Sequence, residues 1–152
     1  MTPLAFTKRL SRLRWREWLI LSEASAMLAL ASLAIRFVPF RTLVGALGAA
    51  HPHTGGDASS DARRADEASW AVRAAAPFLP WRTVCFQKGL ALHVMLRRRG
   101  IRSLLHYGVA QRAETGLAAH VWVSAGERVL IGGREAPEFA CLATYPAAPR
   151  TQ

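Results

Sequence analysis

The sequence predicts an α+β fold in which N-terminal helices precede a cysteine-bearing helix that packs on an antiparallel β-meander. Two observations support this. Helical apolar patterns fill most of the first hundred residues, and after Gly100 the pattern changes to alternating runs separated by short turns. The chain has 152 residues, of which 51% are apolar and 20% charged, so we expect one folded domain with a real core.

The first fifty residues predict a helical segment, 1–50. Residues 19–35 form a long apolar run, and Pro39 is expected to end that helix because proline cannot continue it. Residues 40–48 then favour a short second helix. Both helices are expected to belong to one compact domain with the rest of the chain.

The apolar run raises the question of a membrane. It is slightly shorter than the ~20 residues a spanning helix needs. It also contains Glu23, whose carboxylate would cost a few kcal/mol, roughly, in lipid. A helix buried in the core or facing a partner explains the run with fewest assumptions. A weak membrane-surface contact through residues 8–37 and a true span stay open as alternatives.

Residues 51–62 are rich in Gly, Ser and Asp and predict a flexible loop before the core at 63–152. His51 and His53 have a spacing that a metal site could use. No cysteine or carboxylate cluster accompanies them, so we expect a solvated loop, with no metal and no cofactor. Residues 61–76 contain strong helix formers and favour another helix.

The chain carries a formal net charge of +10. Residues 1–50 and 83–152 contribute +5 each, and residues 51–82 contribute zero. The charge is therefore spread, and its one cluster, at residues 97–99, has no aromatic side chains interleaved with it. Motifs typical of nucleic-acid binding are missing, so we expect no nucleic-acid partner. With two cysteines and no visible secretory signal, reduced thiols and a cytoplasmic location are expected.

Residues 83–100, TVCFQKGLALHVMLRRRG, predict one amphipathic helix with Thr83 as its N-cap and Gly100 just beyond its end. Cys85 would be the second helical residue. At that position the helix dipole and unpaired backbone N–H groups favour a negatively charged sulfur. Gly89, one turn further on, would leave the sulfur uncrowded. The alternative is that Cys85 merely fills space in the core.

Three strands are predicted after the helix, at residues 101–111, 117–124 and 128–133, with turns at 112–116 and 125–127. The alternation in the second strand is clearest. It sets one face, which carries the histidine and tryptophan of AAHVWV, against an apolar face.

A nucleophilic thiolate needs a general base. His93 lies eight positions from Cys85, about 12 Å along the same helix, which is too far for contact. His106 could be either a polar-face or a core residue. His120 is the best candidate because small neighbours leave room for a substrate backbone. Trp122 on the same face could wall the site.

The stretches CFQKGLALHVMLRRRGI and AHVWV stand in that order, with Cys85 and His120 thirty-five residues apart. Over about residues 77–146 the chain resembles the lasso-peptide biosynthesis B2 proteins, the stand-alone leader-peptidase form of the B protein. The resemblance implies a transglutaminase-like and papain-like core. It also implies a cysteine peptidase that cuts the leader from a ribosomally made precursor peptide. The implied partners are that precursor, a separate leader-recognition protein and an asparagine-synthetase-like cyclase.

By the same resemblance, Cys85 would be the nucleophile and His120 the base. The family's third residue, an aspartate, is expected at about residues 131–133, where this chain has Ile-Gly-Gly. Glu135 is the nearest carboxylate downstream and is our candidate for the third position, with a polar substitute or a Cys–His dyad as alternatives. Two other functions stay open: an impaired scaffold of the maturation complex, and an acyl-transferring enzyme.

Overall fold

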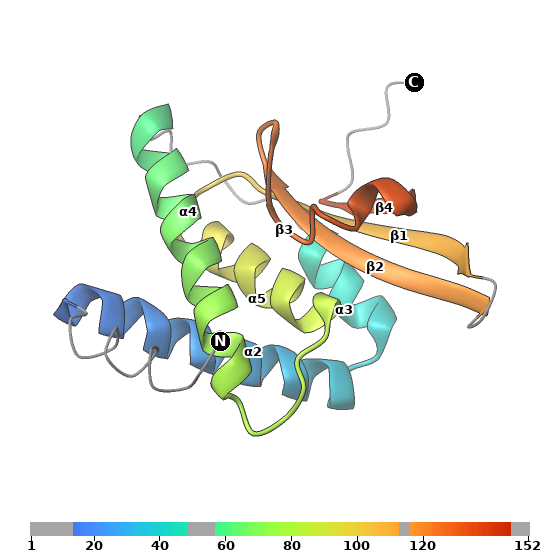
Figure 1. The fold of residues 1–152 in the computed structure, drawn as a ribbon, viewed down its shortest axis with the longest axis horizontal. Coiled ribbons are helices and arrows are strands. Elements are labelled where there is room, and N and C mark those ends of the chain that lie inside the picture. Colours follow the sequence, from blue (N-terminus) through green and yellow to red (C-terminus); the bar gives the residue numbers. More distant parts are fainter. Residues whose placement is uncertain (1–13, 49–56, 113–115, 147–152) are drawn as a thin grey trace.

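The computed structural model describes residues 14–48, 57–112 and 116–146. It confirms the predicted α+β class, with helices first and one antiparallel sheet after them (Figure 1). The elements in chain order are α2 (Trp15–Phe37), α3 (Phe40–Gly48), α4 (Ala58–Ala75), η1 (Ala76–Phe78), α5 (Cys85–Arg98), β1 (Leu104–Arg112), β2 (Gly116–Ala125), β3 (Arg128–Ile131), η2 (Ala136–Glu138) and β4 (Ala140–Tyr145).

The sheet has four antiparallel strands in the order β3-β2-β1-β4. Its register sets His106 opposite Trp122 and Gly108 opposite His120. Three strands match the predicted meander. The fourth, β4, was not predicted. β3 ends at Ile131, two residues earlier than expected, because the chain turns at Gly132 with φ +75°.

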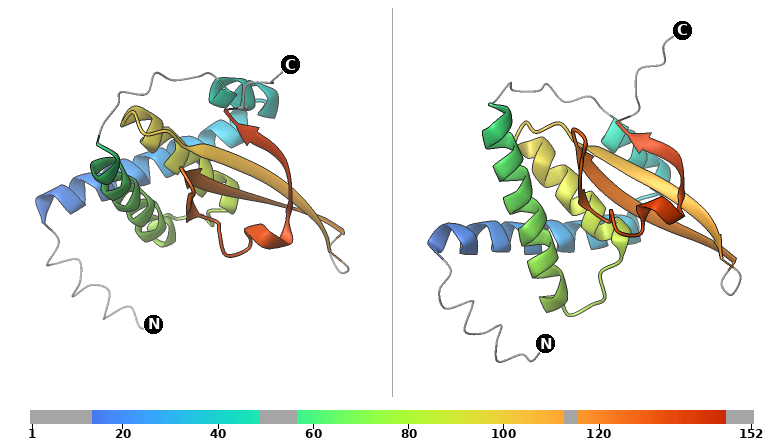
Figure 2. Two further views of the ribbon diagram at one scale, coloured as in Figure 1. Left: turned by 90° about the horizontal axis from the view of Figure 1, so that it is seen from above. Right: turned by 45° about the horizontal axis from the view of Figure 1, so that its top comes forward.

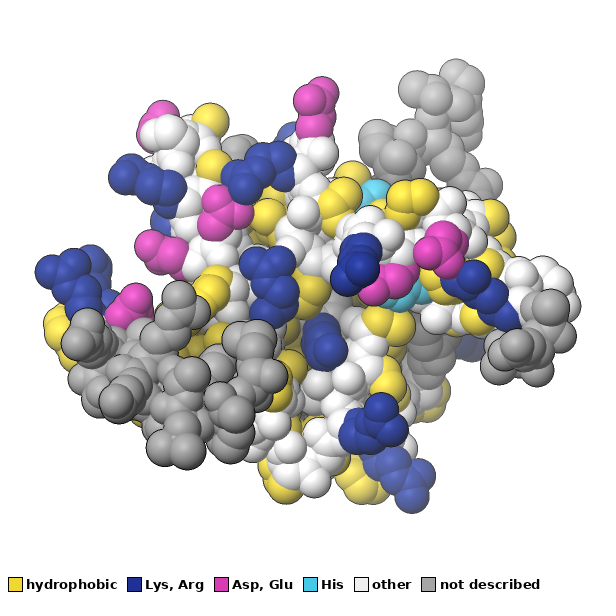
Figure 3. Space-filling view, in the orientation of Figure 1, with side chains coloured by type: hydrophobic (Ala, Val, Ile, Leu, Met, Phe, Trp, Pro, Cys, Tyr) yellow, Lys and Arg dark blue, Asp and Glu magenta, His cyan; other side chains and the backbone are white. Residues whose placement is uncertain are grey.

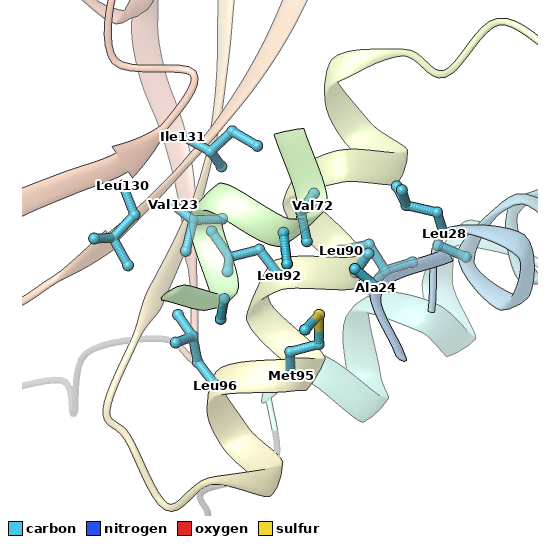
Figure 4. Packing of buried hydrophobic residues seen from close by; sticks show 14 of the residues in the cluster. Ala24, Leu28, Val72, Leu90, Leu92, Met95, Leu96, Val123, Leu130 and Ile131 are labelled. Atoms are coloured by element: carbon cyan, nitrogen blue, oxygen red, sulfur yellow. The ribbon is translucent and has the colours of Figure 1, made fainter. Parts of the chain in front are cut away.

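The core lies between three layers: the sheet, α5 with α4 beside it, and α2 (Figure 2). Figure 4 shows Leu92 and Leu96 of α5 in the cluster with Val123, Leu130 and Ile131 of the sheet. Leu90 of the same helix lies beside Ala24 and Leu28 of α2 in that view. α5 is therefore the central element, and both neighbouring layers fix its position.

Gly89 lets α5 approach β2 closely. A Cβ atom built at Gly89 would lie 2.7 Å from Cγ1 of Val121 and 3.6 Å from Cγ2 of Val123. Contacts of 2.7 Å do not occur between real carbon atoms, so any side chain here would push the helix off the strand. Gly89 therefore has a packing role between α5 and β2, which the sequence did not predict.

α4 begins earlier than predicted. Asp57 caps it by accepting a hydrogen bond from the backbone N–H of Ser60 at 3.2 Å, and residues 58–62 of the expected loop are helical. The hydrogen bonds from Ser59 and Ser60 also hold the pKa of the Asp57 carboxyl below its usual value. His51 and His53 lie outside the described residues.

The N-terminal helices end where the sequence predicts, with α2 stopping at Phe37 and α3 at Gly48. Within the described residues α2 is one helix that is long and apolar enough to cross a membrane by length and composition. In this fold it packs on α4 and α5 instead, with Ala24 and Leu28 fully buried. Glu23 accepts hydrogen bonds from Arg99 at the end of α5, including one of 3.1 Å to Oε1, and the two form an ion pair.

Candidate active site

Cys85 is the first residue of α5 and is partly buried. The N-cap is Val84 rather than the predicted Thr83, because Gln87 supplies a capping interaction from inside the helix. Its side-chain Oε1 accepts a hydrogen bond from the backbone N–H of Val84 at 2.8 Å. Cys85 therefore lies at the very start of the helix, where backbone N–H groups lack intrahelical acceptors. The side-chain oxygen of Gln87 is thus used in this cap.

His120 lies in the middle of β2 and is 9% exposed. Its Nε2 atom is 2.8 Å from the backbone carbonyl oxygen of Gly132. A carbonyl oxygen can only accept, so Nε2 donates and carries the proton. In the neutral imidazole the lone pair is then on Nδ1, and Nδ1 is the atom that can take a proton from another group.

Two aromatic rings hold the imidazole from the sides. Trp122 is stacked with it at a centroid distance of 6.1 Å, and Phe139 lies against it at 5.0 Å in a tilted arrangement. Trp122 was expected beside the site. Phe139 was missed, because it precedes β4 in a segment for which the sequence predicts no element.

The predicted third residue, Glu135, is close to His120 without bonding it tightly. Its Oε2 lies 3.9 Å from Nε2, and its side chain is 54% exposed. The Gly132 carbonyl is nearer and stands in the segment where the resemblance leads one to expect an aspartate. The structure therefore places the Gly132 carbonyl oxygen in contact with Nε2 of His120, and the Glu135 carboxylate further from the same atom.

Cys85 and His120 lie in the walls of two cavities, whose volumes are about 670 Å³ and about 410 Å³. Both residues line both cavities, although no hydrogen bond joins their side chains. The lining of the larger cavity includes three basic residues, Arg73, Arg82 and Lys88, and one acid, Glu135. The smaller one is mostly apolar and is lined by Ile35, Val38, Leu43, Val84, Phe86, Tyr107, Ala119 and Val121.

The other described histidines have structural roles. His93 is fully buried in α5, with Nδ1 3.0 Å from the hydroxyl of Ser103. His106 lies on the same side of the sheet as Trp122, on which it is stacked at 5.3 Å, and its Nε2 is 2.9 Å from the hydroxyl of Ser124. Partial burial holds the pKa of His106 below its usual value.

Basic side chains are spread over the surface around the site and do not gather in one patch (Figure 3). Figure 3 shows Lys and Arg side chains spread over this face, above helices and sheet alike. Several are paired: Arg128 donates to Asp66 at 2.8 Å, and Arg112 forms an ion pair with Glu138. Among the described residues, no three His, Cys, Asp or Glu side chains group in a way that could hold a metal ion.

A cysteine at the start of a helix and a histidine on a strand of the adjacent antiparallel sheet are the kinds of group, a nucleophile and a base, that thiol-based acyl chemistry uses. The comparison with known families agrees. The chain matches the Transglutaminase-like superfamily over residues 27–144, more than half its length, and it belongs to that superfamily. The superfamily contains cysteine proteases and transglutaminases. No curated protein and no solved structure matches the chain.

The matched region begins inside α2 and ends in β4. The second half of α2 and all of α3 therefore belong to the same family unit as the cysteine helix. This agrees with the smaller cavity, whose walls include Ile35 of α2 and Leu43 of α3.

Proposed function

We propose that this protein is a cysteine peptidase that removes the leader from a lasso-peptide precursor through a thioester intermediate. The observation that carries the proposal is that Cys85 of α5 and His120 of β2 line the same two cavities. The resemblance of residues 77–146 to the stand-alone B proteins supplies the substrate class. Membership of the transglutaminase-like superfamily supports the thiol chemistry.

The first step joins the Cys85 sulfur to the scissile carbonyl carbon. His120 takes the thiol proton, and the same proton then goes to the leaving amine as the peptide bond breaks. The backbone N–H of Cys85 is our candidate donor to the carbonyl oxygen while that oxygen is negatively charged. Water then attacks the thioester, releasing the leader's carboxylate and restoring the thiol.

The bond between His120 and Gly132 supports a particular division of roles on the ring. Because Nε2 donates to the carbonyl, Nδ1 is the nitrogen left to exchange protons with the sulfur. Glu135, 3.9 Å from Nε2, would stabilise the imidazolium that forms when Nδ1 is protonated. Glu135 is thus a positioning residue in this proposal rather than a group that touches the substrate.

The test is cleavage of a purified precursor, with the leader-recognition and cyclase proteins added, followed by mass spectrometry of the products. Cys85→Ala is expected to abolish cleavage while leaving the thermal unfolding temperature unchanged. Cys141→Ala is the matched control, because Cys141 is the other free cysteine and is exposed on β4. Cleavage by Cys85→Ala at the wild-type rate would refute the proposal.

Acyl transfer is the second candidate, because the superfamily includes transglutaminases and the thioester is common to both reactions. Adding a primary amine to the reaction distinguishes them. A peptidase releases the free carboxylic acid, whereas a transferase releases the amide of the added amine. A scaffold without activity would give neither product, and the lack of an aspartate at residues 131–133 is the feature that favours it.

A further inference from the structure

α2 exposes large apolar side chains near both of its ends, on one side of the helix. These side chains are at least half exposed: Trp15 (70%), Trp18 (51%), Leu19 (57%), Leu30 (55%), Leu33 (54%) and Phe37 (76%). With 3.6 residues per turn, these positions fall within a sector about 120° wide, and the helix is about 34 Å long. We call this surface the α2 stripe.

The opposite side of the helix is fixed in the fold. Ala24, Leu28 and Ala31 are 0–5% exposed, and the Glu23–Arg99 ion pair ties α2 to α5. A helix held in this way cannot enter a bilayer as a span without breaking the core. The large apolar residues of the α2 stripe, by contrast, are exposed.

Two exposed polar residues, Ser22 and Arg36, fall within the sector of the α2 stripe, Arg36 at its edge and in the last turn of the helix. The Ser22 hydroxyl donates to the carbonyl oxygen of Leu19 at 2.9 Å, so burying it strands no donor. The two acids of α2 lie outside it. Glu17 accepts a hydrogen bond from the backbone N–H of Arg14 at 2.7 Å, and Glu23 is paired with Arg99.

Exposed arginines flank the α2 stripe at both ends: Arg14 and Arg16 at the start, Arg36 and Arg41 at the end. This pattern disfavours a second copy of the chain as the occupant. In an antiparallel pair each end would set arginines against arginines, and in a parallel pair each arginine would face its own copy. Such like-charge contacts are unfavourable, whereas an anionic surface attracts every one of them.

We propose that the α2 stripe lies flat on an anionic membrane surface. The tryptophans and leucines enter the boundary between headgroups and acyl chains, and the arginines contact lipid phosphates. Each basic side chain near such a surface contributes about 1 kcal/mol of attraction, which weakens with added salt. This interaction is independent of the peptidase chemistry proposed above.

The test is sedimentation of the full chain with vesicles of phosphatidylcholine alone or mixed with phosphatidylglycerol. We expect binding to the mixed vesicles, little binding to phosphatidylcholine alone, and loss of binding at about 0.5 M salt. The double variant Leu30→Glu/Leu33→Glu should bind at least about tenfold more weakly. Its control, Leu117→Glu/Leu142→Glu, changes two leucines on the sheet that are more exposed still (71% and 65%) and should bind like wild type.

Light scattering and thermal melts of the same variants complete the experiment. All four substituted leucines are exposed, so both variants should unfold at the wild-type temperature. Three results would each overturn the proposal: no binding by wild type, equal binding to neutral and anionic vesicles, or equal loss in both double variants. A wild-type dimer that Leu30→Glu/Leu33→Glu converts to a monomer would assign the stripe to a second copy instead.

Discussion

The substitution Gly132→Ala tests whether the turn after β3 holds His120. Gly132 has φ +75°, a left-handed conformation that costs an alanine roughly 1–2 kcal/mol. A Cβ atom at this position would also lie 2.5 Å from the carbonyl oxygen of Val121 and 3.0 Å from Cα of Trp122. Both are backbone atoms of β2, so the strand or the turn must move, at a further cost of about 1–3 kcal/mol.

Gly116→Ala is the matched control. Gly116 has φ +74°, and a Cβ atom added there would meet nothing within 4 Å, so it carries the same left-handed cost without the clash. The unfolded-state entropy lost by replacing glycine is common to both variants. We expect Gly132→Ala to be less stable than Gly116→Ala by about 1–3 kcal/mol. For a chain of this size, that is roughly 2–12 °C in thermal melts followed by circular dichroism.

The same displacement should lower activity. Moving the Gly132 carbonyl weakens a hydrogen bond that contributes about 0.5–1.5 kcal/mol, which corresponds to a roughly two- to tenfold fall in kcat. Gly116→Ala should keep the wild-type kcat. Equal unfolding temperatures for the two variants would refute the packing argument. A destabilised Gly132→Ala with wild-type kcat would refute the assignment of the carbonyl to His120.

Three further predictions concern single side chains. Glu23→Gln removes the half-buried ion pair with Arg99 and should lower the free energy of unfolding by about 1–2 kcal/mol, measured by urea denaturation. Burial lowers the pKa of His106, so the unfolded chain binds a proton at this histidine more readily than the folded chain does. The free energy of unfolding should therefore fall as the pH drops through about 6.5. Thermal melts should show a smaller fall in His106→Gln. Glu135→Gln should reduce kcat by about fivefold at most, since its contact with His120 is 3.9 Å long and half exposed; a larger loss would make Glu135 the main orienting group.

The sequence predicted the elements that carry the site because their patterns are local. The alternation in AAHVWV and the apolar period of α5 each follow from burial of one face. β4 escaped prediction because its sequence, ACLATY, has an exposed first half and no clean alternation. It forms by pairing with β1 across a register shift at Tyr107 and Gly108, a contact between distant segments that no short window contains.

The start of α5 shows a second limit of prediction from the sequence. Thr83 has the right side chain for an N-cap, yet the helix begins after Val84, because Gln87 reaches back to the Val84 N–H. Because the helix begins one residue later than predicted, Cys85 is its first residue and the Gln87 side chain takes part in the cap. The start of a helix depends on which nearby side chain forms the capping hydrogen bond, and the residue preferences for the N-cap position alone do not decide that.

The backbone conformation at Gly132 explains why this position does not carry an aspartate. The same residue offers its carbonyl oxygen to His120. An aspartate at position 132 would need the left-handed conformation, and its Cβ would meet the backbone of β2 at 2.5 Å. A carboxylate therefore cannot occupy this position without displacing the strand that carries His120. With glycine there, the chain turns sharply enough to direct its own carbonyl at Nε2 and to bring Glu135 within 3.9 Å of the same atom. In the function proposed above, the Gly132 carbonyl would orient His120 and Glu135 would stabilise its charged form, in place of the aspartate that the resemblance implies.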